Sequence, residues 1–428
     1  MPAPATVLST LLLAAAALAN PHAHAHADHA HTAAPCPAAG DGVSYAQVGT
    51  PEWSASFPTP GVPIQTSQIP QAWLTALSAA KSAGKVPSLA PSTQAVPYTN
   101  PTYPGQDPNN MPVCSATYKC RNPEDLWDAP DGVFGSSFDD GPLDTSMPLY
   151  NLLHENNLVT THFMIGVNIL SYPTEFLFAF QTLQSDIAVH TWTHPYMTTL
   201  SDEQVVAELG FTMQLIHNST SGRLPKYWRP PFGDSDERVR AIAKEVFGLR
   251  TVIWNQDTED WSIGEAGGAT RPQVDANLQK WITGPKSPGL IILEHELSND
   301  TTGAFIQAFP LIAQNGWKFE SLARLDGGDV YHNSPDSKPD SEVLPGVVGA
   351  SFSGSVGPIS SSGSGAPATT ATSGKNNVAQ TTTKSAASST KSADGSSKTS
   401  GALAGVSPVS AALAAFAGVL SAALALSS

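Results

Sequence analysis

The chain has 428 residues, of which 13% are charged, and its formal net charge is −15. This length exceeds the roughly 100–200 residues of one compact domain, so part of the chain must be something other than an ordinary globular fold. The acidic balance excludes a nucleic-acid partner as the default, because recognition of phosphates needs a basic face.

The N-terminal end has the pattern of a secreted protein. Residues 7–18 are an apolar run followed by small residues, which predicts a signal peptide over residues 1–19. Residues 20–130 are rich in Pro, His and Ala and predict an irregular extension with one short helix over 71–83. Alternating His and Ala over 22–31 could bind metal, but we favour a solvated, unstructured tract.

Short apolar runs alternate with amphipathic stretches between residues 131 and 325, which predicts parallel β/α units. Helices are expected over 148–156, 202–217, 238–247 and 271–281. The second of these has a clear start signal, with Ser201 as the cap and Gln204 three residues later. Strands are expected over 133–138, 161–165, 186–190, 226–229, 251–255 and 289–293.

Polar residues follow most of the predicted strands. In a parallel barrel the C-terminal strand ends converge on one face, so residues that are distant in sequence meet there. Any one of these residues could have a purely structural role. Such residues at five of six predicted strand ends are not explained by coincidence. The residues are Asp139, Asp140, His190, Arg229, Asp257 and His295.

Two of these groups have the composition of a metal site. Asp139 and Asp140 precede a Gly-Pro pair, which taken alone is more often a solvated turn. His190 and His194 are four residues apart, a separation that suits two nitrogen ligands to one cation. Two histidines and one carboxylate are the ligand set of a catalytic zinc site that keeps a position open for water.

Five segments resemble the motifs of the polysaccharide deacetylases of carbohydrate esterase family 4, the NodB-homology family, and most closely its fungal chitin deacetylases. They are SFDDGP at 137–142, HTWTH at 190–194, RPPFG at 229–233, DTEDW at 257–261 and IILEH at 291–295. The resemblance implies a distorted (β/α) barrel over residues 131–325. It also implies metal-dependent removal of N-acetyl groups from chitin, which gives chitosan and acetate.

The resemblance also implies roles for five residues of the first three motifs. Asp140, His190 and His194 would hold one divalent cation, zinc or cobalt, and Asp139 would be the general base. Arg229 would pair with Asp139 and keep it ionised.

The remaining assignments concern catalysis and substrate binding. The backbone N–H of Phe232 would help to hold the oxyanion, although the family often has Tyr at this position. His295 would be the general acid, and Asp257 would lie beside it and raise its pKa. Trp261 and Leu293 would form an apolar pocket for the acetyl methyl group, with plain core packing as the alternative.

The C-terminal part of the chain changes to Ser, Thr, Gly and Ala, which cannot bury enough apolar surface to fold, so a disordered linker is expected over 326–400. An apolar run over 409–426 ends the chain. Residues 401–428 are therefore interpreted as a GPI-attachment signal that is removed, and a retained single-span helix is the alternative. Both ends predict that the mature protein lies outside the cell, and the resemblance implies the membrane and the wall of a fungus.

An extracellular location bears on three further features. Cys114 and Cys120 are close enough in sequence to form a disulfide across a short loop, which leaves Cys36 as the odd cysteine. Asn218 and Asn299 begin acceptor tripeptides for N-glycans. The sequence leaves the oligomeric state open, and a monomer is expected.

Two other functions have to be distinguished from the favoured one. The motifs determine the chemistry and not the polymer, so acetylated xylan and bacterial peptidoglycan are alternative substrates. A wall-binding protein that has lost catalysis is a different class, but it would have degenerate motifs, and this sequence shows none. Chitin is the favoured partner because of the resemblance to chitin deacetylases, and a lipid anchor, which indicates a eukaryotic cell surface, supports this choice.

Overall fold

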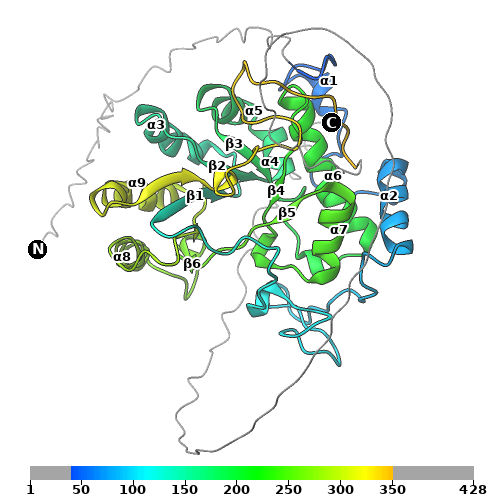
Figure 1. The fold of residues 1–428 in the computed structure, drawn as a ribbon, viewed down its shortest axis with the longest axis horizontal. Coiled ribbons are helices and arrows are strands. Elements are labelled where there is room, and N and C mark those ends of the chain that lie inside the picture. The colour runs from blue at the N-terminus through cyan, green and yellow to red at the C-terminus, as the bar shows by residue number, and fades with distance from the viewer. Residues whose placement is uncertain (1–39, 350–428) are drawn as a thin grey trace, which may run out of the picture. The chain divides into compact units, whose positions relative to one another are not determined.

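The computed structural model describes residues 40–349 (Figure 1). The predicted signal peptide, the His-Ala tract, Cys36 and the predicted anchor signal lie outside these residues. Among the residues described, none of the helices combines the length and the apolar composition needed to cross a membrane.

A six-stranded sheet lies at the centre of the described chain, with its strands in the order β5-β4-β3-β2-β1-β8 and all its pairs parallel. In this register Asp139 at the end of β1 lies opposite Phe163 of β2. The strands are β1 (Val133–Asp139), β2 (Thr161–Met164), β3 (Asp186–Val189), β4 (Tyr227–Trp228), β5 (Arg250–Thr251) and β8 (Lys318–Ser321).

A second, two-stranded sheet closes the strands into a barrel. Residues 250–257 form one segment that begins as β5, paired with β4, and ends as β6 (Gln256–Asp257), paired with β7 (Ile292–Leu293). The β7 segment in turn lies against β1, where the Asp139 N–H donates to the Glu294 carbonyl at 3.0 Å. The expected distorted (β/α) barrel is therefore confirmed.

Helices surround the strands (Figure 1). The four helices expected from the sequence are confirmed to within two residues at each end. They are α3 (Met147–Glu155), α6 (Asp202–Ser219), α7 (Glu237–Phe247) and α8 (Arg271–Ile282). The same region also contains the helices α4 (Gly166–Ser171), α5 (Pro173–Leu177) and α9 (Asn299–Gln314). Local signals explain where two of them begin and end. Ser201 and Gln204 form a capping box at the start of α6, and α7 ends at Gly248, whose φ of 70° favours glycine.

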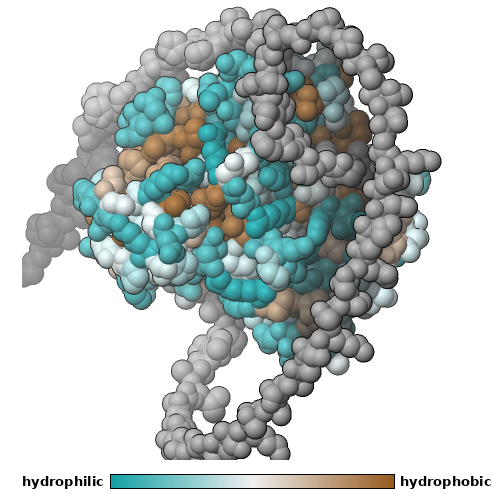
Figure 2. Space-filling view, in the orientation of Figure 1, coloured by the Kyte–Doolittle hydropathy of each residue, from teal (hydrophilic) through white to brown (hydrophobic). Residues whose placement is uncertain are grey.

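The core lies between the strands and these helices. β1 is buried along its whole length, and Phe138 on this strand meets Phe305 of α9 edge-on with 4.8 Å between ring centroids. Figure 2 shows a surface on which hydrophilic residues predominate and apolar patches lie between them. This division is the one expected when apolar burial drives folding.

The N-terminal extension shares this core. Its helices are α1 (Pro51–Ser54) and α2 (Gln71–Ser82), the second close to its expected position, and α2 contacts both α6 and α7. Trp73 of α2 is buried, with its ring 5.2 Å from that of Phe211 and 5.8 Å from that of Phe247. Gly210 of α6 permits this approach, because a Cβ there would lie 2.5 Å from the Trp73 ring.

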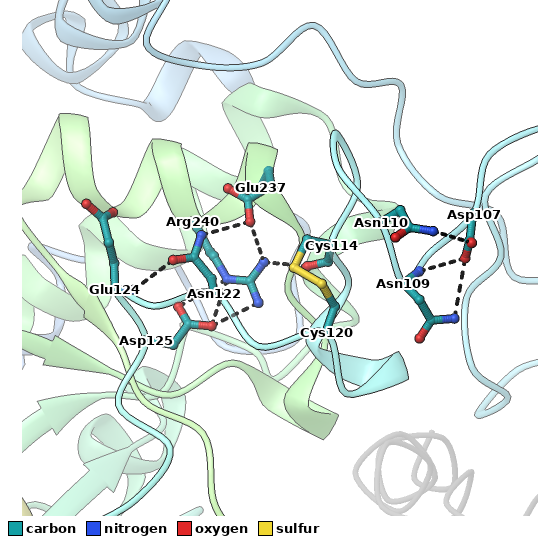
Figure 3. The surroundings of a disulfide bond; sticks show 10 residues. All are labelled: Asp107, Asn109, Asn110, Cys114, Cys120, Asn122, Glu124, Asp125, Glu237 and Arg240. Carbon is teal, nitrogen blue, oxygen red and sulfur yellow. Dashed lines mark hydrogen bonds and ion pairs between the residues drawn. A yellow bond between two sulfur atoms is a disulfide. The ribbon is translucent and has the colours of Figure 1, made fainter. Parts of the chain in front are cut away.

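The extension also contains a disulfide between Cys114 and Cys120, the pair suggested by the sequence. Arg240 of α7 donates to the Cys114 carbonyl and pairs with Asp125 at 2.9 Å and Glu237 at 3.1 Å (Figure 3). The disulfide loop is therefore attached to the barrel by a buried cation.

Folded structure continues beyond residue 325, where the linker was expected to begin. Tyr331 is buried, and its hydroxyl accepts a hydrogen bond from the Ile187 N–H at 3.1 Å. Asn333 accepts from the Leu224 N–H at 2.9 Å. The described residues 326–349 thus pack onto the barrel at the N-terminal ends of β3 and β4.

Candidate metal centre

The candidate site lies where β1 and β3 end. Asp139 is the last residue of β1, and His190 follows the last residue of β3. Asp140, Thr191 and His194 have positive φ angles of 70°, 67° and 60°. Non-glycine residues seldom adopt this conformation, because it costs energy. Residues that do adopt it cluster at functional sites.

Asp140, His190 and His194 lie together there. The Asp140 Oδ1 atom is 3.2 Å from the His190 Nε2 atom and 3.3 Å from the His194 Nε2 atom. One ligand atom from each residue lies within 4.8 Å of the others. The expected cation ligands are therefore brought to one point.

The protonation states of this group suit a cation. Burial opposes ionisation of Asp140, but the neighbouring His194 and His190 outweigh it and lower the pKa of its carboxyl group. Burial lowers the pKa of His194 to about 4, against the opposing effect of Asp140. At neutral pH the site thus contains a carboxylate and a neutral imidazole, the forms that bind metal. The buried Asp140 Oδ1 atom also lacks a hydrogen-bond donor within the described chain.

Contacts around the two histidines fix their orientation. The Nδ1 atom of His190 lies 2.7 Å from the carbonyl oxygen of Arg229. A carbonyl can only accept, so Nδ1 donates this hydrogen bond, and Nε2 is the nitrogen that faces Asp140. Glu208 of α6 accepts hydrogen bonds at 2.8 Å from the backbone N–H groups of Trp192 and Thr193. Glu208 therefore supports the histidine loop, a role that the sequence motifs do not reveal.

The expected base and its partner are both buried. Arg229 donates from Nη1 to the Asp139 Oδ1 atom at 2.5 Å and from Nη2 to the Ser137 hydroxyl at 2.9 Å. Its guanidinium lies over the Phe163 ring, 4.3 Å from the centroid. The second Asp139 oxygen is 3.9 Å from the His190 Nε2 atom and faces the group of cation ligands. One carboxylate oxygen is thus held by Arg229, and the other faces the site.

His295 lies just beyond β7 and pairs with Asp260. Its Nδ1 atom is 2.6 Å from the Asp260 Oδ1 atom, and its backbone N–H donates to Oδ2 at 2.9 Å. Burial lowers the His295 pKa, but the Asp260 carboxylate, with smaller effects from Asp140 and Asp139, outweighs this and raises it to about 10. His295 is therefore charged at neutral pH, as a proton donor must be.

The expectation that Asp257 lies beside His295 is wrong. Asp257 instead accepts hydrogen bonds from the Trp254 indole at 3.2 Å and from the Glu259 N–H at 2.9 Å. Asp257 ends β6, and the chain then turns through a short 3-10 helix, Asp260–Ser262, that brings the second carboxylate of the motif to β7. The DTEDW segment contains both aspartates, so this alternative was present in the sequence.

The three residues expected to bind substrate lie in different environments. Phe232 has a φ of 57° in the turn Pro231–Gly233, and its side chain is 38% exposed. Trp261, which follows Asp260, is 41% exposed. Leu293 on β7 is buried in an apolar cluster inside the barrel. Phe232 and Trp261 can therefore meet a ligand directly, whereas Leu293 packs in the core.

A buried polar network lies behind the two aspartates and was not expected from the sequence. The Glu296 carboxylate accepts from the Tyr150 hydroxyl at 2.8 Å and lies 2.5 Å from the His162 Nδ1 atom. The Glu296 N–H donates to the Asp139 carbonyl at 3.1 Å. Gly141 leaves room for this side chain, because a Cβ there would lie 2.5 Å from its carboxylate. Glu296 thus supports the turn after Asp139.

The two acceptor asparagines lie away from these groups. Asn299 is exposed at the start of α9. Asn218 is half-buried near the end of α6, and its side-chain oxygen accepts from Gln214 at 2.7 Å. N-glycosylation of either residue remains a prediction.

Comparison with known proteins now adds to this geometry. A family model described as polysaccharide deacetylase matches residues 128–252. A protein named chitin deacetylase 3 from Cryptococcus neoformans var. neoformans is 42% identical over 321 residues, which cover 74% of this chain and 74% of that protein. The chain belongs to the polysaccharide deacetylase family.

Two further relatives of this polysaccharide deacetylase show lower identity. Chitin deacetylase 1 from Saccharomyces cerevisiae is 34% identical over 223 residues, or 51% of this chain and 70% of that protein. The solved structure of a chitin deacetylase from Colletotrichum lindemuthianum aligns with a TM-score of 0.43 and 20% identity, over 47% of this chain and 90% of that one. The matched family region contains Asp139, Asp140, His190, His194 and Arg229.

Proposed function

We propose that this polysaccharide deacetylase hydrolyses the N-acetyl groups of N-acetylglucosamine units in chitin, giving chitosan and acetate. The observation that carries the proposal is the meeting of three cation ligands with a carboxylate and a charged imidazole. Asp140, His190 and His194 lie beside Asp139, and His295 lies at the neighbouring strand end. The names of the relatives support chitin as the polymer.

One divalent cation held by Asp140, His190 and His194 would lower the pKa of water and polarise the acetamide carbonyl. The donor set of two imidazoles and one carboxylate suits zinc, and it also accepts cobalt. We propose that the cofactor is one divalent metal, zinc or cobalt.

The chain's own residues carry the proton transfers. The free oxygen of Asp139 accepts a proton from the attacking water, and Arg229 keeps this carboxylate ionised and oriented. The backbone N–H of Phe232 stabilises the negative charge that develops on the acetamide oxygen. His295 then donates its proton to the leaving amine, which is a poor leaving group unless it is protonated.

We further propose that the enzyme is secreted and acts as a monomer at the fungal cell surface, where a GPI anchor attaches it to the membrane. The supporting observations are the apolar runs at the two ends of the sequence and the disulfide, which persists in oxidising compartments. Phospholipase release of the native protein from a membrane fraction tests the anchor. Retention of the protein after treatment would contradict it.

Release of acetate tests the catalytic proposal. Purified protein is incubated with chitin oligomers, acetylated xylan and peptidoglycan. We expect release from the chitin oligomers and its near loss in Asp139→Asn and His190→Ala, while the exposed Asp144→Asn serves as a matched control that keeps activity. Activity on xylan or peptidoglycan alone would replace chitin as the substrate. Full activity in both site variants would overturn the assignment of roles.

A further inference from the structure

Large apolar side chains are exposed close in sequence to the catalytic groups. Phe232 is 38% exposed in the turn Pro231–Gly233, three residues after Arg229, while Trp261 is 41% exposed beside Asp260. A ring left in water gives up the stabilisation that burial would bring. Exposed aromatic rings beside a site therefore indicate a surface that a ligand covers.

Two aromatic neighbours fix the orientation of the Phe232 ring. It stacks on Tyr196 with 4.0 Å between centroids and 4° between planes. His194, one of the cation ligands, meets it at 61° with 4.6 Å between centroids. Tyr196 covers one face of Phe232 and His194 meets it at a steep angle, so the exposed remainder of the ring forms a fixed apolar surface beside the cation ligands.

A buried carboxylate holds the segments that carry these two rings together. Asp234 follows the turn of Phe232, and its side chain accepts a hydrogen bond from the Thr198 N–H at 2.8 Å. Thr198 lies two residues after Tyr196, so this bond joins the segment that carries Tyr196 to the segment that carries Phe232. The extension adds a third attachment, because the Thr117 hydroxyl donates to Asp234 at 3.1 Å.

A third aromatic side chain lies near this stack. Tyr98 of the extension is 39% exposed. Asp234 and Tyr98 act electrostatically on the Tyr196 hydroxyl, so both lie near the stack. The surroundings of the stack thus include a second phenol, whose chemistry suits the hydroxyl groups of a sugar.

We propose that the Phe232–Tyr196 stack is a binding platform for a sugar unit next to the one that loses its acetyl group. This inference rests on the proposed function and names a subsite for it. Aromatic faces suit pyranose rings, whose apolar C–H groups can lie flat against them. In this proposal the N–H of Phe232 serves the acetyl group of the reacting unit, and its ring serves the neighbouring unit.

The test compares the chitin dimer with the hexamer. Phe232→Leu and Tyr196→Ala should raise KM for the hexamer by about fivefold. In Tyr196→Ala kcat should stay nearly unchanged, because Tyr196 does not touch the reacting atoms. The rise for the dimer should be clearly smaller. Tyr196→Phe keeps the ring and should keep the wild-type dependence on length. The matched control is Leu344→Ala, an exposed apolar residue whose N–H bonds to Asn333 near the opposite end of the barrel.

Two results would overturn the platform while leaving the proposed function intact. One is a hexamer KM that stays at the wild-type value in both variants. The other is an equal change for dimer and hexamer, which would place the ring beneath the reacting unit itself. If Phe232→Leu does not fold, Tyr196→Ala decides the question, with its melting temperature and metal content measured alongside. Failure of the wild-type enzyme to release acetate from either oligomer would reject the proposed function and the platform together.

Discussion

Replacement of Asp260 by Asn removes the charge that keeps His295 protonated. The two side chains are buried, and the Nδ1 to Oδ1 distance is 2.6 Å. An opposite charge this close typically moves a titration by about one to three pH units, or about 1.4–4 kcal/mol. The protonated form of His295 is the active one in the proposed mechanism. Activity is therefore lost as pH rises through its pKa, which is raised to about 10, and a bound cation moves this limit lower.

The alkaline limb of kcat/KM is the quantity to measure in this variant. We expect Asp260→Asn to move it to lower pH by about one to three units, with about a fivefold to five-hundredfold loss of activity at the pH where the wild-type enzyme is half active. Asp257→Asn is the matched control, because Asp257 contacts Trp254 and Glu259 instead of His295, and its alkaline limb should stay in place. The reasoning is refuted if the Asp260 variant keeps the wild-type profile, or if only the Asp257 variant moves.

Three further outcomes follow from the contacts described. Treatment with a chelator should abolish acetate release, and zinc or cobalt should restore it; full activity in protein shown to be metal-free would contradict this. Glu296→Gln should lower the free energy of unfolding by about 1–3 kcal/mol, because the buried groups of Tyr150 and His162 lose a charged partner; a midpoint of denaturation equal to the wild type would count against the network. Cys114→Ser should lower the free energy of unfolding by about 2 kcal/mol, which is the loop entropy expected for a bridge to Cys120 six residues away. The stability of this variant should not change when a reductant is added. A stability equal to that of the wild type would show that the remaining contacts hold the loop alone.

Much of the barrel could be predicted because its signals are local. The cap at Ser201 and the apolar spacing that follows it locate α6 without reference to the rest of the chain. The segment 250–257 is different, because its division into β5 and β6 depends on which neighbour each half pairs with. α9 contains Pro310, a residue that normally interrupts helices, and the prediction did not include it.

The candidate site likewise has residues that local sequence signals predict and residues that they do not. Cation ligands can be expected from residue types at strand ends, because the parallel fold brings those ends together. The partner of His295 could not be chosen in this way, since the motif has two carboxylates and only the turn after β6 selects Asp260. Glu208 and Glu296 act through the backbone of other segments, and those contacts exist only in the folded chain.

The metal content of the purified protein tests the central claim most directly. His194 is the cation ligand best suited to substitution, because its side chain is 25% exposed and Asp140 and His190 are almost fully buried. We predict one divalent cation per chain in the wild type and less than a tenth of that in a folded His194→Ala variant. A variant that retains one cation per chain would contradict the assignment of Asp140, His190 and His194 as the metal centre.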